Sequence, residues 1–193
     1  MKTPKLWRTP LITVAAPSGG GKSSFVDRIC REDQRLKDIV TCTTRSPRAG
    51  EEQGKGYFFM STKEFDRRLQ NGEFVESAHV HNHLYGTLRD TLEQAWAEGC
   101  CAIMDVDVQG VATFKKCFPE SKSIFILPPS IDELRRRVLS REGKAPSDLE
   151  LRLRTAAREL ELAPQFDAQV LNDDFESGFK RFQKIVDQWL EPL

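Results

Sequence analysis

The chain has 193 residues, of which 39% are hydrophobic and 30% are charged, a composition typical of one soluble globular domain with a sizeable core. Its 29 basic and 29 acidic residues cancel, so no overall field would draw it onto nucleic acid or an anionic membrane surface. The sequence contains no apolar run near the roughly 20 residues that span a bilayer, and residues 1–10 lack the apolar core of a secretion signal.

The first predicted elements are a buried strand over residues 11–15 and a helix from about Lys22 to Asp33, joined by a glycine-rich turn. A strand, a glycine turn and a helix start in this order are typical of a phosphate-binding loop, because glycines let backbone N–H groups turn inward around an anion. Lys22 can reach the β- and γ-phosphates, and the Ser23 hydroxyl can bind Mg²⁺. The residues predicted to hold the triphosphate are Ala16, Pro17, Ser18, Gly19, Gly20, Gly21, Lys22, Ser23 and Ser24.

This motif departs from the usual G-x-x-x-x-G-K-[ST] pattern at Ala16, which stands where the pattern has its first glycine. The change is chemically mild, since alanine is small and asks only that the backbone avoid a positive φ. A flexible glycine-rich linker is the alternative interpretation. A linker would not be flanked by a buried strand and an amphipathic helix.

A small β-rich unit is predicted over residues 40–89, with a helix inside it and another at its end. Strands are expected at 39–44, 57–60, 74–80 and 84–86, and the polar residues 45–52 read as a loop. Ser61 is a good N-cap for a helix that runs through Leu69, with Glu64 completing a capping box. A second helix is expected to begin at Thr87 and to end near Ala97.

The rest of the chain alternates short apolar strands with helices, a pattern typical of a parallel sheet covered on both faces. The strands are expected at 100–107, 123–127 and 168–171, and the helices at 109–117, 131–142, 147–162 and 175–189. In such α/β sheets the site lies at the carboxyl ends of the strands. We therefore expect the glycine loop and the acids Asp105 and Asp107 to meet at that edge.

Three groups of charged residues could carry chemistry. Asp105 follows a buried strand and could hold Mg²⁺ directly or through water, although an acid at a strand end can also be a simple helix cap, as Asp107 can. Arg45 and Arg48 lie three residues apart on a loop and could clamp a phosphate, against the alternative of solvated surface arginines.

Glu76 is unusual because the alternation of its strand gives it the same face as Phe74 and Ala78. A buried carboxylate needs a partner. The N1–H and N2–H₂ donors of guanine would suit it, whereas adenine has an acceptor at N1.

The third group is the basic stretch that begins at Arg135. Arg137 and Arg141 are four residues apart and share a helical face, so they could neutralise a phosphoryl group during transfer. A solvated helix face and a nucleic-acid patch are the alternatives, and the lack of interspersed aromatic residues weakens the second.

The chain resembles the guanylate kinase family, on motifs that occur in family order from about Leu11 to Trp189. These motifs are APSGGGKSS, TTRSPRAGE, GYFF, FVESAHV, YGT, MDVDVQG, SIFILPPS and VLNDDF. The resemblance implies a P-loop core with a five-stranded parallel sheet at residues 9–39, 90–131 and 159–193, a GMP-binding insert at 40–89 and a helical lid at 132–158. Leu84 departs from the family pattern, where a second tyrosine is common, and Thr41 replaces a common serine.

By the same resemblance, the enzyme transfers the γ-phosphoryl group of ATP to GMP, and also to dGMP, with Mg²⁺ as cofactor. The phosphate of GMP would contact Arg45, Arg48, Tyr57 and Tyr85, and its base would contact Thr41, Glu76, Thr87 and Asp105. Lys22, Arg45, Arg137, Arg141 and Arg152 would act in the transfer step. Asn172 would contact the adenine of ATP, and Ser23 and Asp105 would hold the metal.

Two rival functions remain open from the sequence. A non-catalytic interaction module of the same fold is opposed by the intact Lys22 and Ser23, because such modules have degraded phosphate loops. A kinase for a different small acceptor is opposed by Glu76 with the Arg45 and Arg48 pair. Five cysteines without a Cys-x-x-Cys spacing favour reduced thiols in the cytoplasm.

Overall fold

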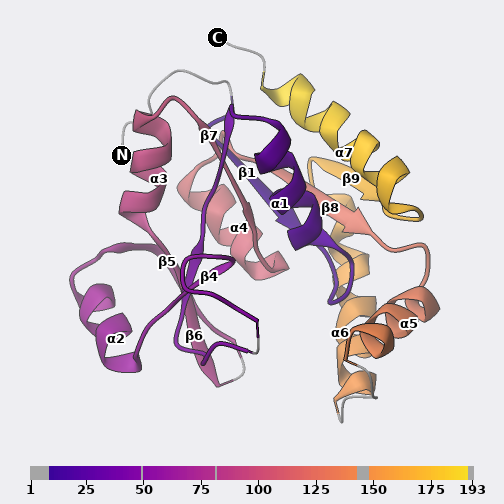
Figure 1. The fold of residues 1–193 in the computed structure, drawn as a ribbon, viewed down its shortest axis with the longest axis horizontal. Coiled ribbons are helices and arrows are strands. Elements are labelled where there is room, and N and C mark those ends of the chain that lie inside the picture. Colours follow the sequence, from indigo (N-terminus) through magenta and orange to yellow (C-terminus); the bar gives the residue numbers. More distant parts are fainter. Residues whose placement is uncertain (1–8, 49, 81, 143–147, 191–193) are drawn as a thin grey trace.

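A computed structural model describes residues 9–48, 50–80, 82–142 and 148–190. Its centre is a five-stranded parallel sheet in the order β2-β7-β1-β8-β9 (Figure 1). The strands are β1 (Leu11–Ala15), β2 (Leu36–Asp38), β7 (Cys101–Asp105), β8 (Lys122–Leu127) and β9 (Ala168–Leu171). The parallel α/β core predicted from the sequence is therefore confirmed.

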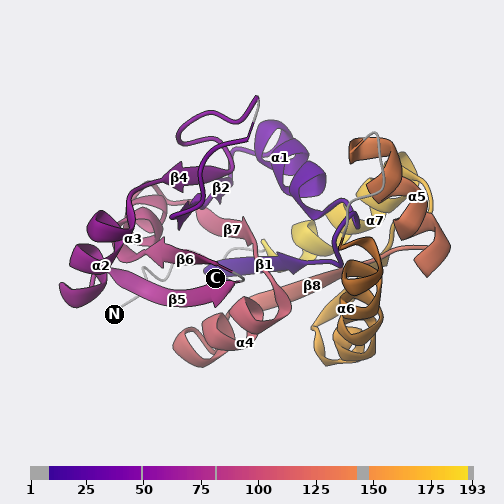
Figure 2. The ribbon, with the colours of Figure 1, turned by 90° about the horizontal axis from the view of Figure 1, so that it is seen from below.

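Helices cover both faces of this sheet (Figure 2). One face packs against α1 (Lys22–Glu32) and α7 (Phe175–Trp189), where Phe25, Phe179 and Phe182 form an aromatic cluster. The other face packs against α3 (Arg89–Ala97), α4 (Val108–Cys117) and α6 (Leu149–Leu162). Because neighbouring strand residues point to opposite faces, Ile12 joins the first core and Leu11 the second.

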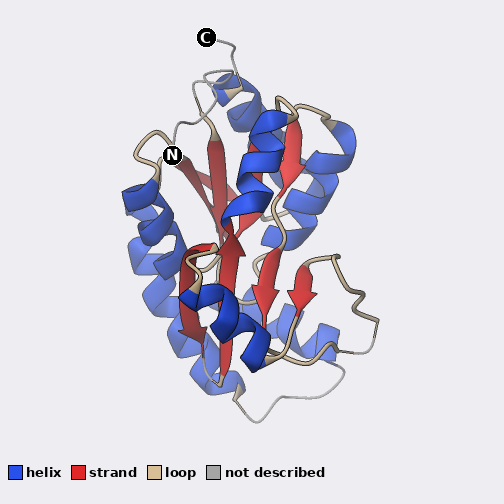
Figure 3. Cartoon of the chain, turned by 90° about the vertical axis from the view of Figure 1, so that its left-hand side faces the viewer, coloured by secondary structure: helices blue, strands red, loops and turns tan. Residues whose placement is uncertain are grey.

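A second sheet of four strands lies beside the first, in the order β4-β3-β6-β5, and Figure 3 shows the strands of both sheets between the helices. Its elements are β3 (Thr41–Thr43), β4 (Tyr57–Phe59), β5 (Phe74–Val80), β6 (His83–Leu88) and the helix α2 (Thr62–Gln70). Phe65 of α2 stacks on Phe74 of β5 at 4.4 Å between ring centroids and seals a small core there. The predicted β-rich unit is thus a separate sheet.

Two predictions for this region are wrong in detail. The apolar stretch 39–44 was expected to be one strand, but the chain pairs with the large sheet through Leu36–Asp38 and with the small sheet through Thr41–Thr43. The Ile39 N–H still donates to the Ile103 carbonyl at 2.9 Å, so the chain crosses between the sheets at the next residue. The helix expected from Thr87 begins at Arg89, because Thr87 pairs with Glu76 inside β6.

The helices α5 (Ile131–Glu142) and α6 stand together on the side away from the small sheet (Figure 1). They pack through a cluster of Leu134, Val138, Leu149, Leu153 and Ala156. Ser130 caps α5, since its hydroxyl accepts from the Glu133 N–H at 3.1 Å. The short 3₁₀ helix Ala163–Gln165 then leads into β9.

None of the helices in the described ranges combines the length and apolar character needed to cross a bilayer. The structure describes all five cysteines, and each is a free thiol.

Candidate active site

The glycine loop connects β1 to α1 as the sequence predicts. Gly19 and Gly21 have φ values of +84° and +94°, which side chains with a Cβ rarely adopt, and the Gly20 N–H donates to the Pro17 carbonyl at 2.8 Å. Gly21 is the N-cap of α1 and supplies no side-chain cap, so the first N–H groups of the helix remain available to an anion. The loop lines a cavity of about 280 Å³ with Lys22, Ser23, Ser24 and Arg137.

Ala16, where the loop departs from the usual motif, restricts which residue can stand at position 20. A Cβ built on Gly20 would lie 2.7 Å from the Ala16 Cβ and 2.9 Å from the Pro17 carbonyl oxygen. Both separations are too short for real side chains. The extra methyl group at Ala16 is therefore accommodated against a residue that has no side chain.

Ser23 and Asp105 meet at the carboxyl edge of the large sheet, and the Ser23 hydroxyl donates to Asp105 Oδ2. Hydroxyl and carboxylate oxygens are ligands that suit Mg²⁺, which usually keeps several waters and substrate phosphates in its shell. Among the described residues, no three His, Cys, Asp or Glu side chains gather to form a metal cage. The oxygen pair fits a metal ion that is also bound by the phosphates of a nucleotide.

Asp38, at the end of β2, joins this acidic edge and was not anticipated from the sequence. Burial, with Asp105 and Asp27 nearby, raises its pKa from 3.8 to about 6. Burial and Asp105 also raise the pKa of Asp27 on α1. The edge of the sheet thus holds more negative charge than the two acids visible in the motif.

A second cavity, of about 220 Å³, opens between the two sheets. Glu76 and Thr87 face each other across β5 and β6, and the Thr87 hydroxyl donates to Glu76 Oε1 at 3.0 Å. Burial is the main cause that raises the pKa of Glu76, and the charge of Asp107 adds to it. The cavity is lined by Lys22, Thr41, Tyr57, Glu76, Ala78, Tyr85, Asp105, Val106, Asp107 and Gly110.

Asp107, which the sequence places at this edge with a helix cap as the alternative, is both a cap and a site residue. It is the N-cap of α4, where its Oδ1 accepts from the Gly110 N–H at 2.6 Å. It also lines the second cavity opposite the Glu76 strand. The Asp105-x-Asp107 spacing after a buried strand was the available signal, but a cap and a cavity wall look alike in sequence.

Arg45 is held in place by several contacts in the small sheet. Its Nη2 donates to Glu51 Oε1 at 2.9 Å and its Nη1 to the Ser46 carbonyl at 2.8 Å. The guanidinium lies 5.3 Å from the Tyr57 ring centroid and 5.4 Å from that of Phe59. Tyr57, whose pKa burial raises to about 12, is a neutral hydroxyl at the cavity wall.

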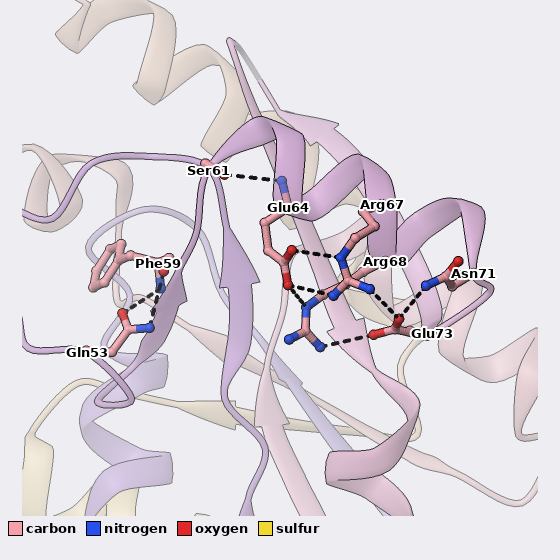
Figure 4. A network of polar contacts seen from close by, with 8 residues as sticks. All are labelled: Gln53, Phe59, Ser61, Glu64, Arg67, Arg68, Asn71 and Glu73. Atoms are coloured by element: carbon pink, nitrogen blue, oxygen red, sulfur yellow. Dashed lines mark hydrogen bonds and ion pairs between the residues drawn. The ribbon is translucent and has the colours of Figure 1, made fainter.

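The loop that carries these arginines is fixed from both ends. Glu51 Oε2 accepts from the Arg48 N–H at 2.7 Å. Farther along, the Gln53 amide accepts from the Phe59 N–H at 2.9 Å and donates to the Phe59 carbonyl at 3.2 Å, as a strand neighbour would (Figure 4). Arg48 itself is exposed and does not line the second cavity.

Figure 4 also shows the end of α2 tied to the start of β5, where Arg68 donates to both Glu64 and Glu73. Arg67 binds Glu64 through two nitrogens. This partly buried network supports the small sheet and contains no predicted site residue.

The remaining predicted residues lie on or beside the α5–α6 pair. Arg137 lines the loop cavity, and its Nε donates to Glu133 Oε1 at 2.8 Å. Arg152 bonds Asp148 on its own helix at 2.9 Å and lines neither cavity. The side chain of Arg141 lies outside the described residues. Asn172 is buried, and its amide contacts the glycine loop.

Comparisons with known proteins agree with this geometry. The profile of the guanylate kinase family matches residues 8–189. A guanylate kinase of Bdellovibrio bacteriovorus is 55% identical over 183 residues, which cover 95% of this chain and 99% of that protein. A guanylate kinase of Thermotoga maritima is 39% identical over 176 residues, or 91% of this chain and 85% of that protein.

The fold comparison gives the same family. The crystal structure of a guanylate kinase from Anaplasma phagocytophilum is similar, with a TM-score of 0.77 and 29% sequence identity. The match covers 98% of this chain and 89% of that one.

Proposed function

This chain belongs to the guanylate kinase family and is a nucleoside monophosphate kinase, and from that premise we propose that it transfers the γ-phosphoryl group of ATP to GMP or dGMP. The observation that carries the proposal is the position of Lys22, which lines both the glycine-loop cavity and the cavity beside Glu76. One ammonium group can therefore face a triphosphate on one side and a monophosphate on the other.

Catalysis in this arrangement comes from positioning and charge neutralisation. The acceptor oxygen of GMP is already anionic, so no general base is needed. Two nucleotides of like charge must be held in line, and Lys22 and Arg137 supply positive charge beside the loop, while Arg45 supplies it in the small sheet. No hydrogen bond or ion pair joins the Lys22 ammonium to another described residue, and the charge of Lys22 acts to lower the pKa of Glu159, which burial raises.

Ser23 and Asp105 are the residues that would hold Mg²⁺, and Asp105 would do so directly or through water. When bound with ATP, the ion would neutralise charge on the phosphate oxygens. Before the ion binds, the hydrogen bond from Ser23 to Asp105 keeps these two oxygens side by side.

The base of the acceptor would be read by Glu76 in the second cavity. A carboxylate can accept from both N1–H and N2–H₂ of guanine, whereas adenine presents an acceptor at N1 and would leave the carboxylate unpaired. Thr41 and Thr87 supply hydroxyl groups beside it, and Asp105 lines the same wall. The GMP phosphate would bind toward Arg45, Arg48, Tyr57 and Tyr85.

Closure of the two flanking units over the core completes the proposed cycle. Arg141 and Arg152 would reach the transferred group from the α5–α6 lid, and closure would exclude water that could otherwise accept the phosphoryl group. The five free thiols suit a reducing compartment, and the cytoplasm is the proposed location.

A coupled assay of ADP release over GMP, dGMP, AMP, CMP and UMP tests the proposal. We expect turnover with GMP and dGMP and little with the other three. A chain that binds GMP but releases no ADP would instead be a non-catalytic member of the family. Equal turnover with AMP would contradict the role of Glu76.

A further inference from the structure

Asn172 follows β9 and has only 3% of its surface exposed. Its backbone N–H donates to the Leu127 carbonyl at 2.7 Å, which fixes it at the carboxyl end of β8. Its side-chain Nδ2 donates to the Gly20 carbonyl oxygen at 2.8 Å, inside the glycine loop. The amide is therefore engaged by the loop rather than directed to solvent.

This hydrogen bond sets the orientation of one peptide plane in the loop. The described residues contain no cis peptide bond, and in a trans peptide the C=O and the N–H point in opposite directions. Since Asn172 holds the carbonyl of Gly20, the N–H of Gly21 points away from Asn172. A peptide between two glycines is the least restrained by side chains and the easiest to flip.

Gly21 and Asn172 are also in tight contact. A Cβ on Gly21 would lie 2.8 Å from the Asn172 Nδ2, and the Gly21 φ of +94° already disfavours any side chain. Gly21 lines the loop cavity and caps α1. The orientation of its N–H consequently bears on how the loop holds an anion.

The α5 helix also contacts Asn172. The Asn172 carbonyl oxygen accepts from Arg137 Nη2 at 3.0 Å, and the side chain of Val138 is 3.3 Å from the Cβ position of Gly19. One buried residue thus contacts both the glycine loop and the helix that covers it.

We infer that Asn172 is a positioning residue for the triphosphate, because its amide locks the Gly20–Gly21 peptide with the Gly21 N–H turned toward the phosphates. This inference deepens the proposed function and rests on it. It differs from the expectation that Asn172 contacts the adenine base, because one N–H of its amide donates to the loop and the residue is buried.

Two substitutions test the role. Asn172→Asp keeps the size of the side chain but sets an oxygen against the Gly20 carbonyl oxygen. Asn172→Ala removes the donor with a shorter side chain and serves if the aspartate variant does not fold. Asn71→Ala is the matched control, since Asn71 is exposed and its side-chain amide donates to Glu73.

The measurement distinguishes a contact with the phosphate chain of ATP from a contact with its base. Calorimetry on the full chain in Mg²⁺ buffer would measure the affinity for ATP, for inorganic tripolyphosphate, which has no base, and for GMP. Loss of a buried hydrogen-bond partner predicts that ATP and tripolyphosphate weaken by the same factor, about tenfold or more, while GMP binding is unchanged.

Three outcomes would overturn the inference. A loss of ATP affinity with normal tripolyphosphate affinity would place Asn172 at the base. A parallel loss for GMP would show a general structural defect, and full affinity for all three ligands would show that the loop keeps its shape without the amide. Absence of GMP phosphorylation by the unmodified chain would instead contradict the proposed function, and the tripolyphosphate comparison would still stand.

Discussion

The Thr87 hydroxyl and the Glu76 carboxylate are joined by a 3.0 Å hydrogen bond across paired strands of the small sheet. Thr87 is fully buried, so the bond fixes the carboxylate at the cavity wall. Glu76 therefore has a defined orientation before any ligand binds. That preorganisation is what a residue that discriminates between bases requires.

The Glu76→Gln variant should lose base discrimination. A hydrogen-bonding pocket can reject a mispaired analogue by roughly 10⁴-fold, and we expect the ratio of kcat/KM for GMP over AMP to fall at least about tenfold. In the unmodified chain, the KM for GMP should rise as the pH falls through the raised pKa of Glu76, at a higher pH than for an ordinary glutamate. Glu93→Gln, on the exposed surface of α3, is the control, and an unchanged ratio in Glu76→Gln would refute the assignment.

The Lys22→Ala variant should separate binding from turnover. Removing one group that stabilises transition-state charge commonly lowers kcat by about 10²- to 10³-fold, and Lys22 is the cation that borders both cavities. GMP affinity, measured by calorimetry, should persist because the insert supplies most of its contacts. Lys63→Ala on α2 is an exposed control, and equal loss of GMP binding in Lys22→Ala would contradict this division of roles.

The Arg45→Lys variant should weaken GMP binding even though the charge is retained. Lysine cannot make the two hydrogen bonds to Glu51 and Ser46 while lying over the Tyr57 ring. We expect the KM for GMP to rise about tenfold or more, with ATP affinity unchanged. Arg67→Lys gives the comparison, because Arg67 also donates through two nitrogens, both to Glu64, outside the site.

Ala16 and Gly20 should show coupled effects. Gly20→Ala places a methyl group 2.7 Å from the Ala16 Cβ and 2.9 Å from a backbone oxygen, so ATP binding should fall. Adding Ala16→Gly removes the first clash but not the second, and should restore part of the affinity. Ala16→Gly alone should bind ATP normally. Strictly additive effects in calorimetry would show that the two residues do not interact.

Asp38 should give the stability an unusual pH dependence. Its pKa is raised to about 6 in the folded chain, so the folded state favours the protonated form. Protonated Asp38 therefore favours the folded state. This contribution to the unfolding free energy is fully present below about pH 4 and is lost as the pH rises through 6, a change on the order of 2–3 kcal/mol. Asp38→Asn should therefore gain stability over the unmodified chain at pH 7.5 but not at pH 4, in urea titrations. Asp66→Asn, at an exposed position on α2, is the matched control.

The sequence predicted β1, β7 and β8 of the large sheet well because each is a short, mostly apolar run with glycine or proline beside it. Ser61 and Asp107 act as caps where the pattern placed them. The strand prediction failed at residues 36–44, where the chain leaves the large sheet and enters the small one. This change depends on tertiary pairing and leaves no break in the apolar stretch 39–44. The helix predicted from Thr87 begins two residues later, because Thr87 pairs with Glu76 in the small sheet.

The site was less predictable than the fold. The glycine loop, Asp105 and Glu76 could be proposed from local chemistry, since each residue is unusual where it stands. Asp38 gains its role only from burial beside Asp105, and Asn172 from a contact with a loop 152 residues away. Such roles depend on which elements meet in space.

The chain enters the small sheet once, after Ile39, and leaves it once, before Arg89. Everything that this sheet contributes to the acceptor cavity is consequently encoded in a single uninterrupted stretch. Recombination at two breakpoints could exchange that stretch between relatives and alter which monophosphate is accepted. The residues that bind the phosphoryl donor would be unchanged. The preference for an acceptor and the preference for a donor could therefore evolve separately in this fold.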